Sequence, residues 1–124
     1  MWIRYNPNPC GRSVSDCAVR AIAKALKIDW EEAYLILCKA GFQMCDLPNA
    51  DATWGAVLRK EGFERHNLPN DCPNCYTIKD FCMDYPVGVF VLGTGNHAVT
   101  VVNGDYYDAW NSGDEIPIYY WELR

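Results

Sequence analysis

The chain has 124 residues, half of them apolar, with five Trp, eight Tyr and a formal net charge of −5. This length predicts a single domain, residues 1–124, whose core can fold without metal or disulfide crosslinks. The negative charge argues against a nucleic-acid partner, because no excess of Lys and Arg is available to neutralise phosphates. The apolar runs are too short to cross a bilayer and no signal segment opens the chain, so we expect a soluble, cytoplasmic protein without a membrane partner.

The first predicted helix covers residues 17–28. Apolar and small residues repeat there at helical spacing over most of the circumference. Such a pattern is typical of a helix buried between two layers, in which small residues let neighbouring backbone approach closely. Arg20, Lys24 and Lys27 are expected to face solvent.

Three further helices are expected before residue 87, where the apolar pattern changes its period. Asp29 opens a capping box and begins a helix that ends at Gly41. The other two are expected at 53–61 and, after a cap by Thr77, at 78–85.

From residue 87 the apolar pattern takes the two-residue period of strands. Short β-branched and aromatic runs alternate with Gly, Asn-Gly and Asn-Ser-Gly-Asp turns. We therefore predict an α+β fold, in which helices within about 1–86 pack on an antiparallel sheet within about 87–124. The expected strands are 87–93, 97–102, 105–111 and 116–123, the last with its YYWEL run at a sheet edge.

A tight hairpin is predicted at Asn103-Gly104, the strongest two-residue type I′ signal. Counting back from this turn places His97 opposite Trp110 and makes His97 and Asp108 diagonal neighbours on one face. The carboxylate is then placed to hold the Nδ1–H of the imidazole, as a general base requires, with Trp110 shielding the bond from water. The alternative is a His-Asp pair that serves stability alone.

The seven cysteines are expected to be free thiols, because their number is odd and no signal segment is present. Cys17 stands where a polar loop becomes the first helix, with Asp16 or Ser15 as the expected N-cap. A thiol in this first turn has its pKa lowered by the helix dipole, and the unpaired N–H groups can hold an oxyanion. The charge of Asp16 opposes the thiolate. Together with His97 and Asp108, Cys17 completes a Cys-His-Asp set.

The segments DCAVRAIAKAL and NHAVTVVNGDYYDAW resemble the papain-like cysteine peptidase superfamily, most closely its small bacterial and phage members. The resemblance implies a papain-like fold with Cys17 as nucleophile, His97 as base and Asp108 as the residue that orients the base. Trp110, two residues after Asp108, matches the spacing of the papain branch. Residues 42–86 contribute nothing to the resemblance.

The sequence departs from this family at the oxyanion hole. The family usually carries Gln or Asn six residues before the nucleophile, where this chain has Gly11. The backbone N–H of Cys17 is one expected donor, and the side-chain candidates are Asn6, Asn8 and Ser13. Loss of one donor costs about two to three orders of magnitude in rate. Asn111 is an alternative orienting residue, but the hairpin count turns it away from His97.

The remaining cysteines admit other interpretations. Cys72 and Cys75 form a C-x-x-C that follows a polar segment, which disfavours redox catalysis. They are weak candidates for a zinc site, so we expect no metal, because four ligands are needed and none of Cys10, Cys45, Cys82 or His66 lies at a matching spacing. Core positions are expected for Cys38 and Cys82, a surface position for His66, and Cys10 is an alternative reactive thiol.

These patterns predict a cofactor-free cysteine peptidase that forms a thioester with a peptide or protein substrate. A deamidase or transglutaminase-like acyl transferase would use the same triad. The alternatives from other classes are an inactive papain-fold binding or inhibitor module and a zinc-stabilised adaptor. The cleft-forming regions expected at 42–54 and 66–77 mix acidic and apolar residues, which disfavours acidic substrates.

Overall fold

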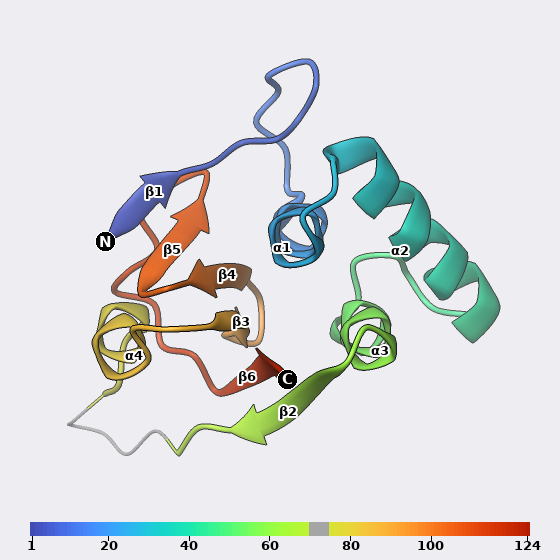
Figure 1. Ribbon diagram of the computed structural model, residues 1–124. Coiled ribbons are helices and arrows are strands. Elements are labelled where there is room, and N and C mark those ends of the chain that lie inside the picture. Colours follow the sequence, from blue (N-terminus) through green and yellow to red (C-terminus); the bar gives the residue numbers. More distant parts are fainter. Residues whose placement is uncertain (70–74) are drawn as a thin grey trace.

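The computed structural model describes residues 1–69 and 75–124. Within these residues the chain forms an α+β fold with one six-stranded sheet, in the order β1-β5-β4-β3-β6-β2. Helices α1, α2 and α3 cover one face of this sheet and α4 covers the other (Figure 1). The elements in chain order are β1 (Trp2–Arg4), α1 (Cys17–Leu26), α2 (Trp30–Met44), α3 (Asp51–Lys60), β2 (Phe63–Asn67), α4 (Ile78–Asp84), β3 (Val89–Gly93), β4 (Ala98–Val102), β5 (Asp105–Asp108) and β6 (Tyr119–Leu123).

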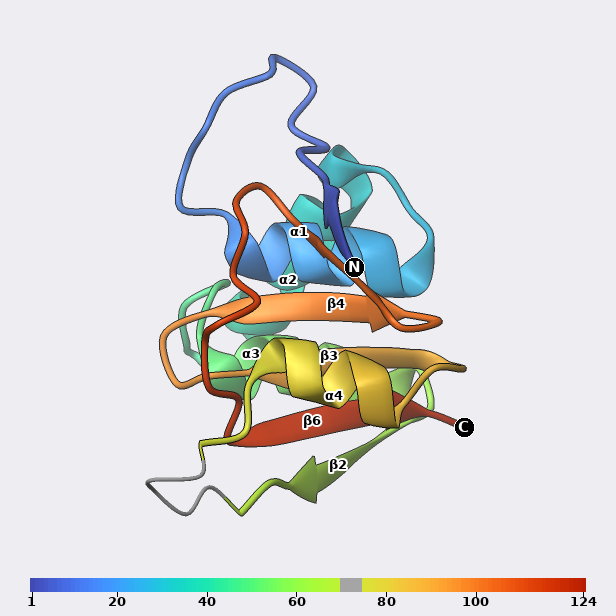
Figure 2. The same ribbon diagram turned by 90° about the vertical axis from the view of Figure 1, so that its left-hand side faces the viewer.

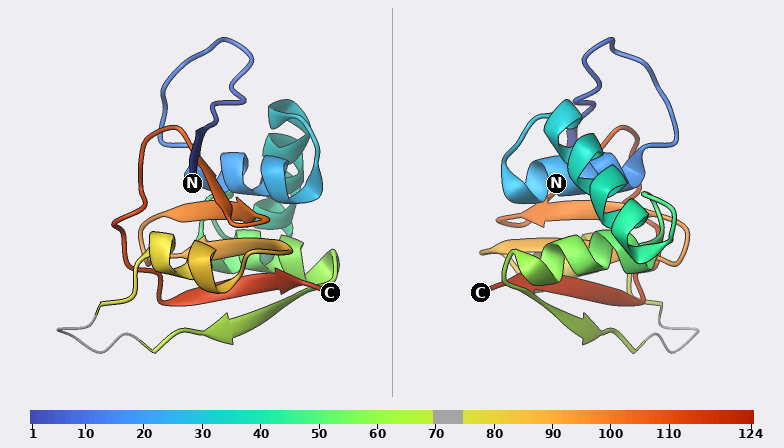
Figure 3. Two further views of the ribbon diagram at one scale, coloured as in Figure 1. Left: turned by 60° about the vertical axis from the view of Figure 1, so that its left-hand side comes forward. Right: turned by 90° about the vertical axis from the view of Figure 1, so that its right-hand side faces the viewer.

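Helix α1 is buried between the sheet and α2, as its sequence predicts (Figures 1 and 3). Ala18, Ala21 and Ala25 are all at most 5% exposed. The small side chains let the helix lie close to β4, where Thr100 Oγ1 donates a hydrogen bond to the Ala21 carbonyl at 2.7 Å. This contact fixes α1 relative to the strand that follows His97.

The N-caps predicted at Asp29 and Thr77 are confirmed, but the end of α2 is not where the sequence suggests. The Asp29 carboxylate accepts from the Glu32 N–H at 2.8 Å, and Thr77 opens a full capping box. Helix α2 passes through Gly41 to Met44 instead of ending at the glycine. A Cβ at Gly41 would lie 2.9 Å from the Asp46 carbonyl oxygen, so this glycine admits the returning loop.

The sheet is mixed, which corrects the expected all-antiparallel arrangement. Strand β1 pairs parallel with β5, while β2 pairs antiparallel with β6. Both added strands come from the part of the chain expected to be helical. Strand β6 lies between β3 and β2, so its YYWEL sequence is internal and not at a sheet edge. The two edge strands escaped prediction because β1 has three residues and β2, FERHN, is mostly polar.

The predicted hairpin is confirmed between β4 and β5. Val102 pairs with Asp105, and Asn103 and Gly104 both have positive φ, 50° and 81°, as a type I′ turn requires. Strand β5 ends at Asp108, three residues earlier than expected. No helix in the described ranges has both the length and the apolar character to span a bilayer.

The starts of α1 and β4 lie at the same end of the sheet (Figure 2). At this end Gly93 is the register partner of Ala98 on one side and of Tyr119 on the other. The fold thereby brings the first residue of α1 next to the residue that precedes β4. Those two residues are Cys17 and His97.

Candidate active site

Cys17 is the first residue of α1 and shares a hydrogen bond with the His97 side chain. The backbone N–H of Ala98 also donates to its sulfur. Burial alone would raise the pKa of the thiol, but these two hydrogen bonds and the nearby charges of His97 and Arg20 lower it below the ordinary value. The Cys17 thiol, which the sequence predicted as the nucleophile, therefore ionises more readily than an ordinary cysteine.

His97 connects this thiol to Asp108. Its Nε2 lies 2.5 Å from Asp108 Oδ2, and its side chain is 9% exposed. The sequence analysis assigned this bond to Nδ1, which is wrong: Asp108 lies on the neighbouring strand, and Nε2 is the ring nitrogen farther from the backbone. Nδ1 is left for the thiol. Burial lowers the pKa of His97, but hydrogen bonds to Asp108 and Cys17 outweigh it and raise that pKa to about 9.

Asp108 is 1% exposed, and four donors engage its two carboxylate oxygens. Oδ2 accepts from His97 and from Ser112 Oγ at 2.6 Å, while Oδ1 accepts from the Ala109 N–H at 2.8 Å and from Arg20 at 3.0 Å. Burial raises the pKa of this carboxyl, but its hydrogen bonds and the charges of His97 and Arg20 lower it overall. The orienting carboxylate is ionised and fixed in position.

Strand β1 and the residue that follows it, Tyr5, bind the backbone carbonyl of Asp108. The Asp108 carbonyl oxygen accepts from the Tyr5 N–H at 2.8 Å and from Trp2 Nε1 at 3.1 Å. The N-terminal strand therefore fixes the end of β5, where the carboxylate leaves the sheet.

Arg20 is the largest departure from the sequence analysis, which placed it in solvent. Its side chain is 7% exposed, and it bridges two buried carboxylates, with Nη1 on Asp16 and Nη2 on Asp108. A buried cation between two acids satisfies both of them. The signal was present in the sequence, because Asp16 and Arg20 have the i,i+4 spacing of a helical ion pair.

Asp16 precedes the helix as expected, but its side chain does not cap it. The carboxylate binds Arg20 and accepts a hydrogen bond from Trp30 Nε1 at 2.9 Å. Two consequences follow for the thiol. The negative charge of Asp16, which was expected to oppose the thiolate, is offset by the Arg20 guanidinium. Because the Asp16 side chain does not cap the helix, the N–H groups of the first turn remain uncapped by it.

A pocket of about 360 Å³ opens in front of the thiol. Trp110 forms part of its wall, with its ring 5.0 Å from that of His97 at 41°, so the predicted contact between the two is confirmed. Trp110 nevertheless stays 46% exposed and lies beyond the end of β5. The lining residues are Ser13, Val14, Ser15, Cys17, Arg20, Asn96, His97, Ala109 and Trp110.

The pocket distinguishes among the candidate oxyanion donors. Ser13 lines it, whereas Asn8 lines a separate cavity on the other side of the loop. Asn8 Oδ1 accepts from the backbone N–H groups of Cys10 and Arg12, and Asn6 Nδ2 donates to the Arg12 carbonyl. Both amides thus shape their own loop. Ser15 and Asn96 also line this pocket, although the sequence did not mark either as an oxyanion donor.

The other predicted residues lie apart from this site. Asn111 accepts a hydrogen bond from the Tyr106 hydroxyl at 2.5 Å and does not line the Cys17 pocket. Cys10 is exposed and does not line the Cys17 pocket, and Cys82 is buried as expected. His66 is half-buried in β2 and stacks on Tyr120.

Only one of the two weak zinc candidates lies in the part of the chain that the structure describes. Cys72 lies outside the described residues, and Cys75 is half-buried. Within residues 1–69 and 75–124, no group of three or more His, Cys, Asp or Glu side chains is arranged to hold a metal ion.

Comparisons with known proteins place this chain in no group. A scan against models of protein families, a search of curated proteins and a search of solved structures each found no match.

Proposed function

We propose that the protein is a cysteine hydrolase of the papain-like type, which cleaves a peptide or amide bond through a thioester on Cys17. The observation that carries this proposal is the continuous hydrogen-bonded chain from Cys17 through His97 to Asp108 at the wall of an open pocket. A nucleophile, a base and a group that orients the base are the three parts that acyl transfer requires.

The protonation states favour an ion pair before substrate binds. The pKa of Cys17 is lowered while that of His97 is raised to about 9, and both shifts favour a thiolate facing an imidazolium over the neutral pair. Asp108 stabilises the imidazolium without taking its proton, because its own pKa is lowered. Thiolate is the reactive form of cysteine, and this arrangement supplies it without added base.

The reaction then proceeds in two balanced steps. The Cys17 thiolate attacks the carbonyl carbon, and the carbonyl electrons move to oxygen, which faces the backbone N–H groups at the start of α1. As the tetrahedral intermediate collapses, the C–N bond breaks and His97 donates its proton to the leaving amine. Water next attacks the thioester while His97 accepts its proton, the C–S bond breaks, and a carboxylic acid and the thiolate are released.

The second oxyanion donor comes from a different residue type than in the family pattern. Gly11 occupies the position of the usual Gln or Asn, and Ser13, Ser15 and Asn96 are the hydroxyl and amide residues in the pocket lining. A hydroxyl or the Asn96 amide can donate to an oxyanion. Replacing each of the three by Ala in turn identifies the donor as the one whose loss slows turnover by about 10²-fold or more.

Trapping the acyl-enzyme tests the proposal directly. The protein is mixed with peptidyl p-nitrophenyl esters, and intact-mass and peptide mass spectrometry locate the acyl group over time. We expect an adduct on Cys17 that forms and then disappears as the free acid is released, and that is absent in Cys17→Ala. Cys10→Ala is the matched control and should behave as the unaltered protein.

The same experiment separates the alternatives. An added amine that appears in the product as an amide would identify an acyl transferase. An adduct that forms on Cys17 but never turns over would favour a binding module that retains the fold. Acylation of the exposed cysteines at the same rate as Cys17 would contradict an activated Cys17.

A further inference from the structure

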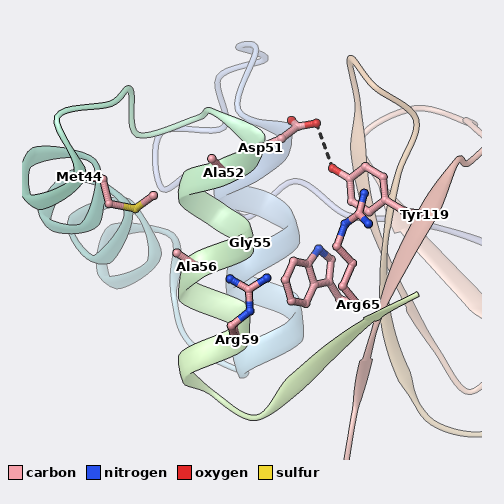
Figure 4. Close-up of a pocket in the computed structure, with 9 residues that line it drawn as sticks. Met44, Asp51, Ala52, Gly55, Ala56, Arg59, Arg65 and Tyr119 are labelled. Carbon is pink, nitrogen blue, oxygen red and sulfur yellow. Dashed lines mark hydrogen bonds between the residues drawn. The ribbon is translucent and has the colours of Figure 1, made fainter. Parts of the chain in front are cut away.

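A second pocket, of about 440 Å³, lies between α3, β2 and β6, away from the Cys17 site (Figure 4). Small residues on α3 form one wall and aromatic residues of β6 form the other. Arg59 from α3 and Arg65 from β2 both contribute to the lining. The complete lining is Met44, Asp51, Ala52, Gly55, Ala56, Arg59, Arg65, Tyr119 and Trp121.

Each of the two guanidinium groups lies over an aromatic ring of β6. Arg65 is the register partner of Trp121 across the β2–β6 pair, so their side chains are neighbours on one face of the sheet. Arg59 approaches the same indole from α3, with its Cζ 5.1 Å from the ring centroid. The Arg65 guanidinium lies 4.3 Å from the centre of the Tyr119 ring. Stacking on aromatic faces holds both cations in place while leaving their N–H groups free to donate.

Neither cation is neutralised by a neighbouring acid. Among residues 1–69 and 75–124, Arg59 and Arg65 form no ion pair, and Arg65 donates one hydrogen bond, to Asn67 Oδ1 at 2.7 Å. The acidic residue in the lining, Asp51, is already engaged by Trp54 and by Tyr119, whose hydroxyl donates at 2.9 Å.

Asp51 also lies at the opposite end of the pocket from Arg59. The two are eight residues apart on α3, about 12 Å along the helix axis, and Figure 4 shows them at opposite ends of the lining. The pocket therefore has Arg59 at one end and the hydrogen-bonded Asp51 at the other, with Arg65 stacked on Tyr119.

A third donor, on a residue that lines the same pocket, has no partner among the described residues. Trp121 is 3% exposed, and its indole Nε1 is buried without a hydrogen bond in the described part of the chain. Leaving a buried N–H unpaired is costly, so such a group points to an acceptor that the folded chain does not itself supply. Gly55 admits the indole here, since a Cβ at that position would lie 2.9 Å from Trp121 Cζ2.

We propose that this pocket binds an oxyanion, either a carboxylate or a phosphate, through Arg59, Arg65 and the indole N–H of Trp121. Two guanidinium groups provide charge and paired donors for the oxygens, and the indole adds a directed hydrogen bond. The aromatic walls and the remaining space accommodate the carbon skeleton that bears the anion. This site is independent of the Cys17 chemistry, and its test does not use turnover.

The indole N–H of Trp121 reports binding directly. In a ¹H–¹⁵N spectrum the five Trp give five indole signals, and Trp121→Phe identifies the one that belongs to Trp121. Inorganic phosphate is titrated in one series and glutarate in a second, both at constant ionic strength against a chloride blank. We expect a saturable shift of the Trp121 signal, and the series with the lower Kd identifies phosphate or carboxylate as the ligand chemistry.

Charge-matched variants complete the test. Arg59→Gln and Arg65→Gln should each weaken binding by about ten-fold or more, since each removes charge-assisted hydrogen bonds. Both residues are exposed, so the fold should persist, as the dispersion of the spectrum verifies. Lys60→Gln removes the same charge from α3 outside the pocket lining and should leave the Kd within about two-fold. The proposal is overturned by a Trp121 signal that does not saturate with either anion, or by equal losses in Lys60→Gln and Arg59→Gln.

Discussion

The Cys17 site and the Arg59–Arg65 pocket hold their charges in opposite ways. At the start of α1, Asp16, Arg20 and Asp108 form a buried chain of alternating sign. The pocket beside α3 is lined by two cations and a residue with a buried indole N–H, with no acid paired to them among the described residues. Buried charges that satisfy one another fix geometry, whereas donors without acceptors remain available to a ligand. The first arrangement suits chemistry on a positioned group, and the second suits capture of an anion.

Removing the central cation of the first site should have the largest effect. Arg20→Gln leaves Asp16 and Asp108 buried without their shared partner, and we expect a loss of about 3–5 kcal/mol in the free energy of unfolding. Guanidinium unfolding followed by Trp fluorescence measures it. Lys39→Gln, on the exposed surface of α2, removes the same charge and should change stability by less than about 0.5 kcal/mol. A loss below 1 kcal/mol for Arg20→Gln would show that this bridge is not central to the fold.

Asp108→Asn should keep the fold while reducing the reactivity of the thiol. The carboxylate raises the pKa of His97, and the imidazolium in turn favours the Cys17 thiolate. We expect alkylation of Cys17 by iodoacetamide at pH 6.5 to slow by at least about ten-fold, the factor carried by one pKa unit. Peptide mass spectrometry measures the rate, with the exposed Cys10 as internal reference. Asp114→Asn, at an exposed carboxylate, is the control. An unchanged rate of Cys17 alkylation in Asp108→Asn would show that the carboxylate does not influence the reactivity of the thiol.

In the second pocket, Gly55→Ala tests how closely the indole approaches α3. Alanine normally stabilises a helix interior by about 0.5–1 kcal/mol relative to glycine. Here the added Cβ would lie 2.9 Å from the Trp121 ring, and overpacking of this kind costs about 1–3 kcal/mol. We therefore expect a net destabilisation of about 1 kcal/mol by thermal or chemical unfolding, together with a shift of the Trp121 indole signal. A gain in stability for Gly55→Ala would show that the Trp121 ring moves aside at little energetic cost.

The smallest expected effect is a pH dependence in Cys17→Ser, which isolates the His97–Asp108 pair. Asp108 raises the folded-state pKa of His97 above its ordinary 6.5. The stabilisation from this pair is therefore fully present below pH 6.5 and is lost as pH rises through the folded-state pKa. Desolvation of both groups opposes their attraction, which keeps the change small. Unfolding of Cys17→Ser and of Cys17→Ser/His97→Gln across pH 6–10 should show the decline in the first variant alone.

The sequence predicted the parts of the site that depend on local patterns. The start of α1 at Cys17 and the Asn103-Gly104 turn come from capping, periodicity and turn chemistry, and together they bring His97 and Asp108 onto one face. The choice of Nε2 over Nδ1 could not be predicted, because it depends on the path of a side chain between two strands. Arg20 was predicted to face solvent because only its own charge was considered. The pairing with Asp16 and Asp108, which allows a charged side chain to be buried, was not.

Non-local pairing accounts for most of the fold that the sequence did not predict. Strand β1 is three residues long and has its partner about a hundred residues away, so no local period reveals it. Strand β2 is mostly polar because it lies at an edge, and polar edge strands lack the usual alternation. The Arg59–Arg65 pocket requires that pairing, since Arg65 meets Trp121 only once β2 lies beside β6.

The wide separation of Cys17 from its partners has a consequence for synthesis. His97 follows Cys17 by 80 residues (97 − 17), which takes a ribosome about 4–16 seconds at about 5–20 residues per second. Over that interval the emerging polypeptide carries a thiol with neither the imidazole nor the Ala98 amide that depress its pKa. The lowered pKa of this thiol thus depends on the last hairpin to be translated, and a prematurely terminated product that lacks this hairpin carries only an ordinary cysteine.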